Sequence, residues 1–531
     1  MRVLLVSGLG ASFKNNEYLR HSLFDKNAVE RLKRTYFDGF DLGQLCFDLR
    51  GTSYPMLRPR RDAVPHLTTF TLEAMLQKCD VEYDVLRTER IWAGGSISLP
   101  RHYGVILVST TYVWDRRTLA RLLDRLTDLC PDTRIVVGGQ YSNLKYARIL
   151  NEHPEVDIVV RGDGEHVLPL LLRALEKGLP LSDVPNLVLR DGDALRLTPH
   201  EMIDLETHPS PSFVGAFPVV PYESMRGCPF ACKFCSFPMA SPVWRYKSAR
   251  KIRDDWARYA AENGARFIKA MDSIFTIPHE RMRELLRLLP SVAVEWEGYS
   301  RANAIKEESF LEGLAAAHCR FLSIGFESMS PRTLAFMDKR VSVTENRHAF
   351  ELLSDGPIGY RCSFMVGYPG ETPNDYRLTH DFLTREYAGH FMLSVFSLQD
   401  EQMPVWADAE RFEIIIHDPD DPDYSWEHTG MDVAMARSLN RNTLDVVRRS
   451  NDDAVLMLWQ ADYHHWLLPH LSAEANLAAE KAVERIAMLP VDHPDPAEGR
   501  AHFRRQLDIL ARYDVSVAEG AVLSAEPLLE A

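Results

Sequence analysis

The chain has 531 residues, of which 46% are hydrophobic and 26% charged, and its formal net charge is -14 at pH 7. This length allows about three domains, and the negative charge argues against a nucleic-acid or anionic-membrane partner, since both favour basic surfaces. No apolar run approaches the ~18 residues needed to span a bilayer. The short apolar run at residues 2–7 fits a buried strand better than a signal peptide, so we expect a cytoplasmic protein.

Residues 1–198 alternate short apolar runs with amphipathic segments. Strands are predicted at 2–7, 81–86, 104–109, 133–137 and 156–160, and helices at 69–78, 116–130 and 166–177. This alternation predicts an α/β domain with a doubly wound parallel sheet, which binds ligands at the carboxyl ends of its strands. A hairpin is predicted at 186–197, and the prolines of residues 199–218 indicate a linker.

A second alternating series covers residues 219–400. Its six strands are predicted at 219–224, 266–270, 293–299, 320–326, 360–366 and 390–397. Six such units predict a partial (β/α)6 barrel, whose chemistry is expected at the carboxyl ends of the strands. Residues 401–531 are predicted to form a mainly helical C-terminal domain.

Three of the eight cysteines, Cys228, Cys232 and Cys235, lie within eight residues directly after the first barrel strand. A loop with C-x-x-x-C-x-x-C spacing can direct three thiolates at three irons of a [4Fe–4S] cluster and leave the fourth iron free for a substrate. A structural zinc site uses four protein ligands, and no fourth Cys or His lies nearby in the sequence. We therefore predict an iron–sulfur cluster, with zinc as the alternative.

Residues 225–236, MRGCPFACKFCS, resemble the signature of the radical S-adenosylmethionine (SAM) superfamily. The resemblance implies that Phe234 packs by the adenine of SAM. It also places four further SAM contacts at the ends of the next three strands, namely Asp272, Ser300, Arg301 and Glu327. Relatives usually carry a second acid after the first of these, where this chain has Ser273.

A doubly wound domain before such a barrel resembles the cobalamin-binding class of this superfamily. The residues that carry the resemblance are Gly138-Gly139 after the fourth strand and Gly162, Gly164 and Glu165 after the fifth. It implies that Ser109, Thr110 and Gln140 also face the corrin. The Asp-x-His-x-x-Gly motif that supplies a cobalt ligand elsewhere does not occur, so the cobalt is expected to lack a protein histidine.

The resemblance implies a cobalamin-dependent radical SAM enzyme that methylates an unactivated carbon of a small metabolite or peptide, using a 5′-deoxyadenosyl radical and methylcobalamin. It also implies an external electron donor such as flavodoxin or ferredoxin, and it assigns no catalytic side chain. Two alternatives stay open: a radical rearrangement, cyclisation or oxidation without methyl transfer, and a non-catalytic cluster or cobalamin sensor. Methylthiolating relatives that modify nucleic acid carry extra N-terminal cluster cysteines, whereas Cys46, Cys79 and Cys130 are dispersed here.

Overall fold

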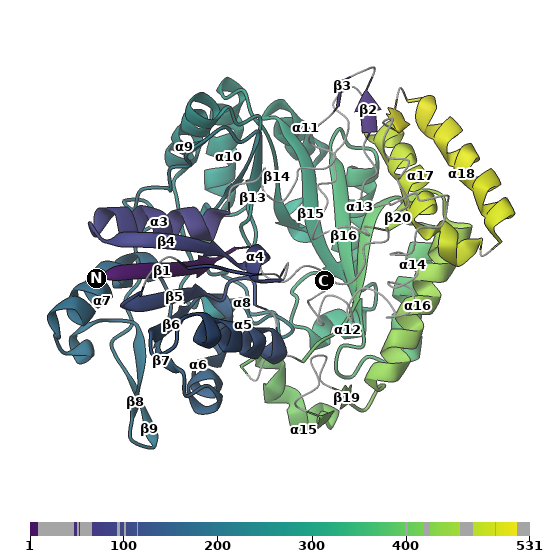
Figure 1. Cartoon of the computed structure of the whole chain (residues 1–531). Helices are drawn as coiled ribbons and strands as arrows, with labels where there is room; N and C mark the ends of the chain where they lie inside the picture. Colours follow the sequence, from purple (N-terminus) through teal and green to yellow (C-terminus); the bar gives the residue numbers. More distant parts are fainter. Residues whose placement is uncertain are drawn as a thin grey trace.

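The computed structural model describes residues 1–8, 47–49, 52–53, 66–92, 96–99, 102–113, 115–398, 402–418, 425–456, 471–493, 495–513 and 515–517. Two seven-stranded sheets dominate the architecture, and they lie next to each other in Figure 1. Three small sheets accompany them: β11 (Met225–Arg226) with β12 (Arg245–Tyr246), β18 (Ile415–Asp418) with β19 (Ser425–Glu427), and β21 (Val515–Val517) with β2 (Phe47–Leu49) and β3 (Thr52–Ser53).

The first sheet has the strand order β4-β1-β5-β6-β7-β8-β9. Its five parallel strands are β1 (Arg2–Ser7), β4 (Glu82–Arg87), β5 (Val105–Ser109), β6 (Arg134–Gly138) and β7 (Val156–Val160). The hairpin of β8 (Leu187–Asp191) and β9 (Ala194–Leu197) extends the sheet in the antiparallel sense. These strands confirm the predicted doubly wound domain, and their order is the flavodoxin-like one.

Helices cover both faces of this sheet, because alternate strand residues are apolar on both sides. Val3, Leu5 and Leu107 pack against α3 (Leu67–Lys78) and α7 (Gly164–Lys177). Leu4 and Val108 pack on the other face, against α5 (Arg116–Leu129) and α6 (Gln140–Glu152). The short α4 (Thr88–Trp92) follows β4. The N-terminal domain therefore presents only the edges and ends of its strands to a ligand.

The second sheet has the order β10-β13-β14-β15-β16-β17-β20, and its strands are all parallel. The first six are β10 (Val219–Tyr222), β13 (Phe267–Ala270), β14 (Glu295–Arg301), β15 (Cys319–Glu327), β16 (Gly359–Val366) and β17 (Gly389–Val395). The helices between them are α8 (Phe237–Ala240), α9 (Ala249–Asn263), α10 (His279–Leu288), α11 (Glu308–Ala316), α12 (Pro331–Phe336), α13 (Val343–Ser354) and α14 (Pro373–Arg385). This series confirms the six predicted β/α units.

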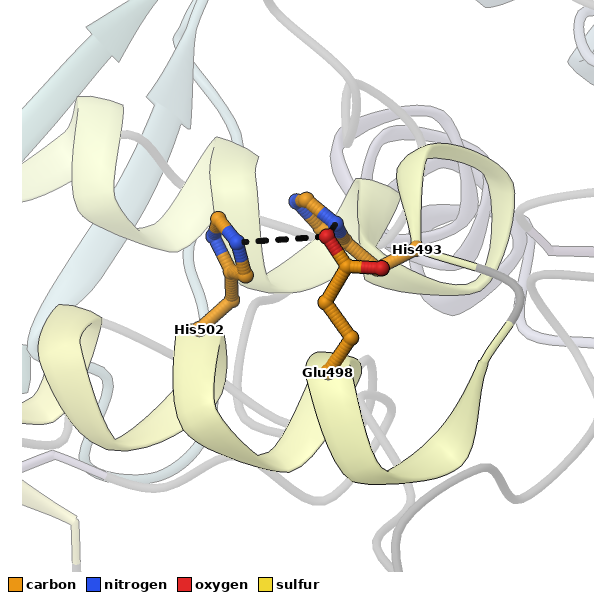
Figure 2. Close-up of side chains that lie close together, drawn as sticks. All are labelled: His493, Glu498 and His502. Atoms are coloured by element: carbon orange, nitrogen blue, oxygen red, sulfur yellow. Dashed lines mark hydrogen bonds and ion pairs between the residues drawn. The ribbon is translucent and has the colours of Figure 1, made fainter.

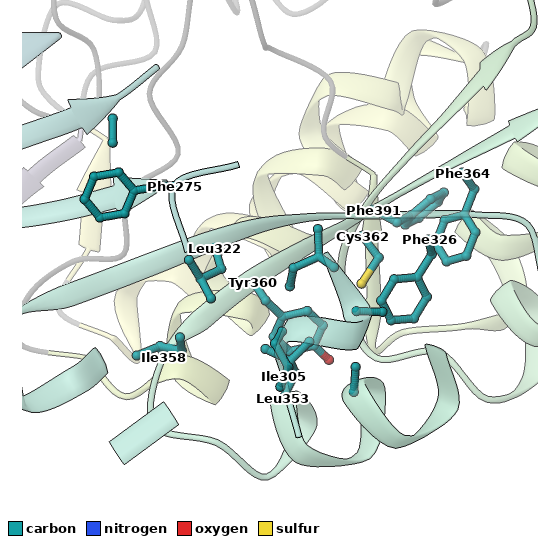
Figure 3. Close-up of a cluster of buried hydrophobic side chains, with 14 of the residues drawn as sticks. Phe275, Ile305, Leu322, Phe326, Leu353, Ile358, Tyr360, Cys362, Phe364 and Phe391 are labelled. Carbon is teal, nitrogen blue, oxygen red and sulfur yellow. The ribbon is translucent and has the colours of Figure 1, made fainter. Parts of the chain in front are cut away.

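The main hydrophobic core lies between these strands and their helices. Phe326 of β15 and Phe364 of β16 pack with ring centroids 5.7 Å apart, beside Cys362 and Phe391 (Figure 3). Because neighbouring side chains of a strand point to opposite faces, Ser323 and Gly325 of β15 face away from this core. The same face of β15 also carries Phe321, which packs against Met392.

The seventh strand, β20 (Ala454–Leu456), pairs with β17 and comes from the region predicted to be mainly helical. Three residues carry no readable periodicity, so only the pairing defines this strand. The remaining elements are α15 (Ala409–Phe412), α16 (Val433–Ser450), α17 (Ala473–Asp492) and α18 (Pro496–Ala511), of which the last two lie at the far edge in Figure 1. None of the helices in the described part of the chain is long and apolar enough to cross a membrane.

Candidate cluster and cofactor sites

The cysteine motif occupies the loop between β11 and α8, directly after the first strand of the second sheet. Gly227 starts this loop with a positive φ of 76°, and a Cβ there would lie 2.5 Å from the carbonyl oxygen of Val243. Only glycine combines a left-handed backbone with so close an approach. The returning chain at residues 241–243 thereby fixes the direction in which the loop leaves β11.

The three thiols lie close enough to influence one another. Burial raises the pKa of Cys228 and raises that of Cys235 to about 11, and the neighbouring sulfur of Cys232 adds to both shifts. The motif thus brings the three sulfurs close together within one loop.

Two cations pack on the aromatic residues of this loop. The Arg301 guanidinium carbon lies 3.8 Å from the ring centroid of Phe230, and Lys339 Nζ lies 5.3 Å from that of Phe234. Lys339 also forms a buried ion pair with Glu327, at 2.8 Å. The structure therefore gathers Phe234, Arg301 and Glu327, three of the residues predicted to contact SAM, around the cysteine loop.

Asp272 and Ser300 are buried near the same loop but are engaged within the protein. The Asp272 carboxylate accepts hydrogen bonds from the backbone amides of Ser224, at 2.7 Å, and Met225, at 2.9 Å. Ser300 Oγ lies 2.9 Å from Thr276 Oγ1. In this arrangement Asp272 holds the chain that leads into the cysteine loop, and a direct contact of either residue with SAM stays a prediction.

A cavity of about 260 Å³ lies at the carboxyl ends of β1, β5, β6 and β7. Seven residues predicted to bind cobalamin line it, namely Ser109, Gly138, Gly139, Gln140, Gly162, Gly164 and Glu165. Thr110, the eighth predicted residue, does not line the cavity. Its hydroxyl donates to the carbonyl of Gly138, which does, at 2.9 Å. A corrin ring is larger than this cavity, which therefore fits only a part of a cobalamin molecule.

Two of the cavity glycines are required by their backbone conformation. Gly139 has φ 113°, and a Cβ there would lie 2.9 Å from the amide nitrogen of Thr111. Gly162 has φ 70°, and its Cβ would lie 2.5 Å from His200 Nε2. Side chains at these positions would strain the backbone, so glycine keeps the floor of the cavity open.

The opposite wall of the cavity comes from the barrel domain, close to the cysteine motif. Arg226 and Phe237, which flank the motif, both line the cavity, together with Ser241 and Arg245. The cavity side of α6 is tied to the same segment, because Asn143 Nδ2 donates to the carbonyl of Ala240 at 3.1 Å. One wall is thus shared by the cavity and the cysteine loop.

A buried ion-pair network crosses this boundary. The Arg226 guanidinium pairs with Asp163 at 2.7 Å, Glu165 at 2.5 Å and Glu223 at 2.9 Å, and Arg245 pairs with Asp163 at 2.5 Å. Burial opposes ionisation of Asp163, but the charges of the two arginines outweigh it and lower the pKa of Asp163 to about 2. Glu165 therefore holds the segment before Cys228 as well as lining the cavity.

Sequence reasoning did not assign roles to Arg226 and Lys339. Arg226 directly precedes Gly227-Cys228, and that position was the available signal. The sequence contained no such signal for Lys339, because this residue reaches Glu327 from a loop in which Asp338 and Arg340 adopt positive φ.

A third cluster of possible ligands lies far from both sites, at the junction of α17 and α18 (Figure 2). His493 Nδ1 and His502 Nε2 lie 3.3 and 3.9 Å from Glu498 Oε1. The two imidazole rings are stacked with centroids 3.5 Å apart and an interplanar angle of 23°. One ion bound in the plane of both rings at ~2 Å would require rings that diverge from it. The stacked arrangement therefore does not suit a metal.

The sequence is similar to known proteins over the region that contains the cysteine motif. Residues 222–383 match the family model of the radical SAM superfamily. An uncharacterized methyltransferase of Pyrococcus horikoshii is 26% identical over 292 residues, covering 52% of this chain and 62% of its own. An anaerobic magnesium-protoporphyrin IX monomethyl ester cyclase of Cereibacter sphaeroides is 28% identical over 283 residues, covering 48% of this chain and 46% of its own. The matches thus span about half to three fifths of these relatives.

Two solved structures are similar over nearly the whole chain. The radical SAM methyltransferase TsrM from Kitasatospora setae, with tryptophan substrate and a SAM analogue bound, superposes with a TM-score of 0.60 at 15% identity, covering 96% of this chain and 99% of its own. The cobalamin-dependent radical SAM enzyme OxsB, with aqua-cobalamin bound, superposes with a TM-score of 0.59 at 15% identity, covering 98% of this chain and 77% of its own.

This chain therefore carries a radical SAM domain at residues 222–383, which include the cysteine loop and the strands β13 to β16. The fold of the described residues, with the doubly wound domain placed before the barrel, is similar to that of the radical SAM methyltransferase TsrM and of the cobalamin-dependent radical SAM enzyme OxsB.

Proposed function

We propose that the protein is a cobalamin-dependent radical SAM enzyme that methylates an unactivated carbon of a small metabolite or peptide. One observation carries the proposal: Arg226 and Phe237, two residues before Cys228 and two after Cys235, also line the cavity of the N-terminal domain. A ligand in that cavity lies beside the cysteine loop. Two cofactors that act on one substrate need this proximity.

In this proposal Cys228, Cys232 and Cys235 hold a [4Fe–4S] cluster, and Phe234, Arg301 and Glu327 bind SAM beside it. The cavity residues, from Ser109 and Gly138-Gly139 to Gly162, hold cobalamin. When bound, the cluster supplies the electron that cleaves SAM and the cobalamin supplies the methyl group. The methyltransferase names of the Pyrococcus relative and of TsrM support methyl transfer.

Contacts of Lys233 anchor the cysteine loop to two later segments of the chain. The Lys233 amide donates to the Met337 carbonyl at 2.9 Å, and the Val405 amide donates to the Lys233 carbonyl at 3.0 Å. Lys233 Nζ also pairs with Asp408. These contacts tie the loop to the segment after α12 and to the segment after β17, and so help to fix its position.

The cyclase relative favours a second candidate function, a radical cyclisation, rearrangement or oxidation without methyl transfer. A non-catalytic sensor is the third candidate. We also infer an external electron donor such as flavodoxin or ferredoxin and a cytoplasmic location. The net charge of -14 supports a partner other than nucleic acid or an anionic membrane.

The test is anaerobic reconstitution of the full chain with iron, sulfide and hydroxocobalamin, followed by SAM and a strong reductant. The control is the triple variant Cys228→Ala/Cys232→Ala/Cys235→Ala. We expect 5′-deoxyadenosine from the wild type only, with S-adenosylhomocysteine whenever cobalamin is bound. 5′-Deoxyadenosine without S-adenosylhomocysteine would favour the cyclisation candidate. A protein that binds neither a cluster nor cobalamin would contradict the proposal.

A further inference from the structure

Arg301 directs its guanidinium at a predicted cluster ligand. It ends β14 and is 4% exposed. Its Nη1 lies 3.5 Å from Cys232 Sγ, which is hydrogen-bond distance for a sulfur acceptor, and its Nη2 donates to the carbonyl of Lys339. The face of the guanidinium rests on the Phe230 ring, at 3.8 Å. These contacts hold the group in one orientation.

Arg301 and the neighbouring Lys339 differ in their partners. Within the described ranges, no carboxylate forms an ion pair with Arg301, whereas Lys339 is balanced by Glu327 at 2.8 Å. Phe230 and the buried Cys232 border the guanidinium with weakly polar groups. A charge acts more strongly on its neighbours in such surroundings than in water.

We propose that Arg301 raises the reduction potential of the cluster by donating a hydrogen bond, and presenting a positive charge, to the sulfur of Cys232. The inference rests on the proposed function, because it requires a cluster at the three cysteines. Reduction adds one electron to the cluster, and that electron comes from the external donor. A donor hydrogen bond to a ligand sulfur and a nearby cation both favour the more negative, reduced state. Arg301 is thus a positioning and tuning residue, beyond the SAM contact that the sequence suggests.

The test is an electrochemical titration of the reconstituted full chain without SAM, monitored by the EPR signal of the reduced cluster. Arg301→Gln removes the charge beside Cys232. Arg320→Gln is the matched control, because Arg320 lies at the other end of the β14–β15 pair, where it contacts Glu295 at 3.5 Å. At a fixed potential, we expect Arg301→Gln to lower the ratio of reduced to oxidised cluster by about tenfold, which is ~59 mV for one electron. The control should match the wild type.

The outcomes separate the inference from the proposed function. A wild type that holds no cluster would overturn the proposed function, and this inference with it. Equal potentials for wild type and Arg301→Gln, with normal iron content, would overturn the inference alone. If SAM affinity fell in that variant at the same time, Arg301 would be a SAM contact only. Should Arg301→Gln fail to hold iron, Arg301→Lys retains the charge without the planar donor pair. For Arg301→Lys, the ratio of reduced to oxidised cluster at the same fixed potential should fall by less than tenfold. An unchanged ratio would overturn the inference.

Discussion

Glu371 is a fully buried carboxyl in the loop between β16 and α14, and it should make the stability of this protein depend on pH. Its Oε2 accepts a hydrogen bond from the Gly367 amide at 2.7 Å, and the side chain is fully buried. Burial raises the pKa of Glu371 from 4.5 to about 8. The side chain is therefore protonated at neutral pH in the folded protein.

The sign of the effect follows from this raised pKa. The folded state binds the proton more tightly than the unfolded state, so the stabilising contribution is complete below pH 4.5 and is lost as the pH rises toward 8. The 2.5 pH units between 4.5 and 7 correspond to ~3 kcal/mol at ~1.4 kcal/mol per unit. Glu371→Gln keeps an acceptor for the Gly367 amide and cannot ionise. This variant should therefore not lose this stabilising contribution as the pH rises.

The assay is thermal unfolding of wild type and Glu371→Gln between pH 5 and 8.5. The unfolding temperature of the wild type should fall relative to that of the variant across this range, and the two should be most alike at pH 5. Glu312→Gln on the exposed side of α11 is the matched control and should follow the wild type. A difference between wild type and Glu371→Gln that does not change with pH would refute the reasoning.

Two further predictions concern the shared wall and the cavity. Arg226→Gln leaves Glu165 as a buried carboxylate without its cation, while Asp163 stays paired with Arg245, and the change should cost roughly 3–5 kcal/mol and lower cluster retention, measured by unfolding and iron content. The exposed Arg196→Gln is its control, and equal stability of the two variants would count against the network. Gly138→Val adds a branched side chain to the cavity at a position without positive φ, where the nearest neighbour of a Cβ is 3.4 Å away. The variant should bind cobalamin about tenfold more weakly, a loss of ~1.4 kcal/mol in binding free energy, while its iron content stays constant. Full retention of cobalamin by the variant would mean that cobalamin binds elsewhere.

Local signals in the sequence determined the elements and the chemistry of this protein. Short continuous apolar runs predicted the five parallel strands of the first sheet and six of the seven strands of the second, because buried parallel strands are apolar along their length. The spacing of Cys228, Cys232 and Cys235 indicated one metal-binding loop. Gly138-Gly139 and Gly162 marked the ends of strands, and the structure places all three on one cavity.

Only the tertiary structure decided which charges meet at these sites. Arg226 and Glu165 are 61 residues apart and Arg301 and Cys232 are 69 apart, so no local pattern links either pair. The same holds for β20, whose three residues become a strand only because the edge of β17 is available for pairing. Strand periodicity and ligand spacing are properties of a short segment. The partner of a buried charge depends on how distant segments pack, which the sequence alone did not reveal.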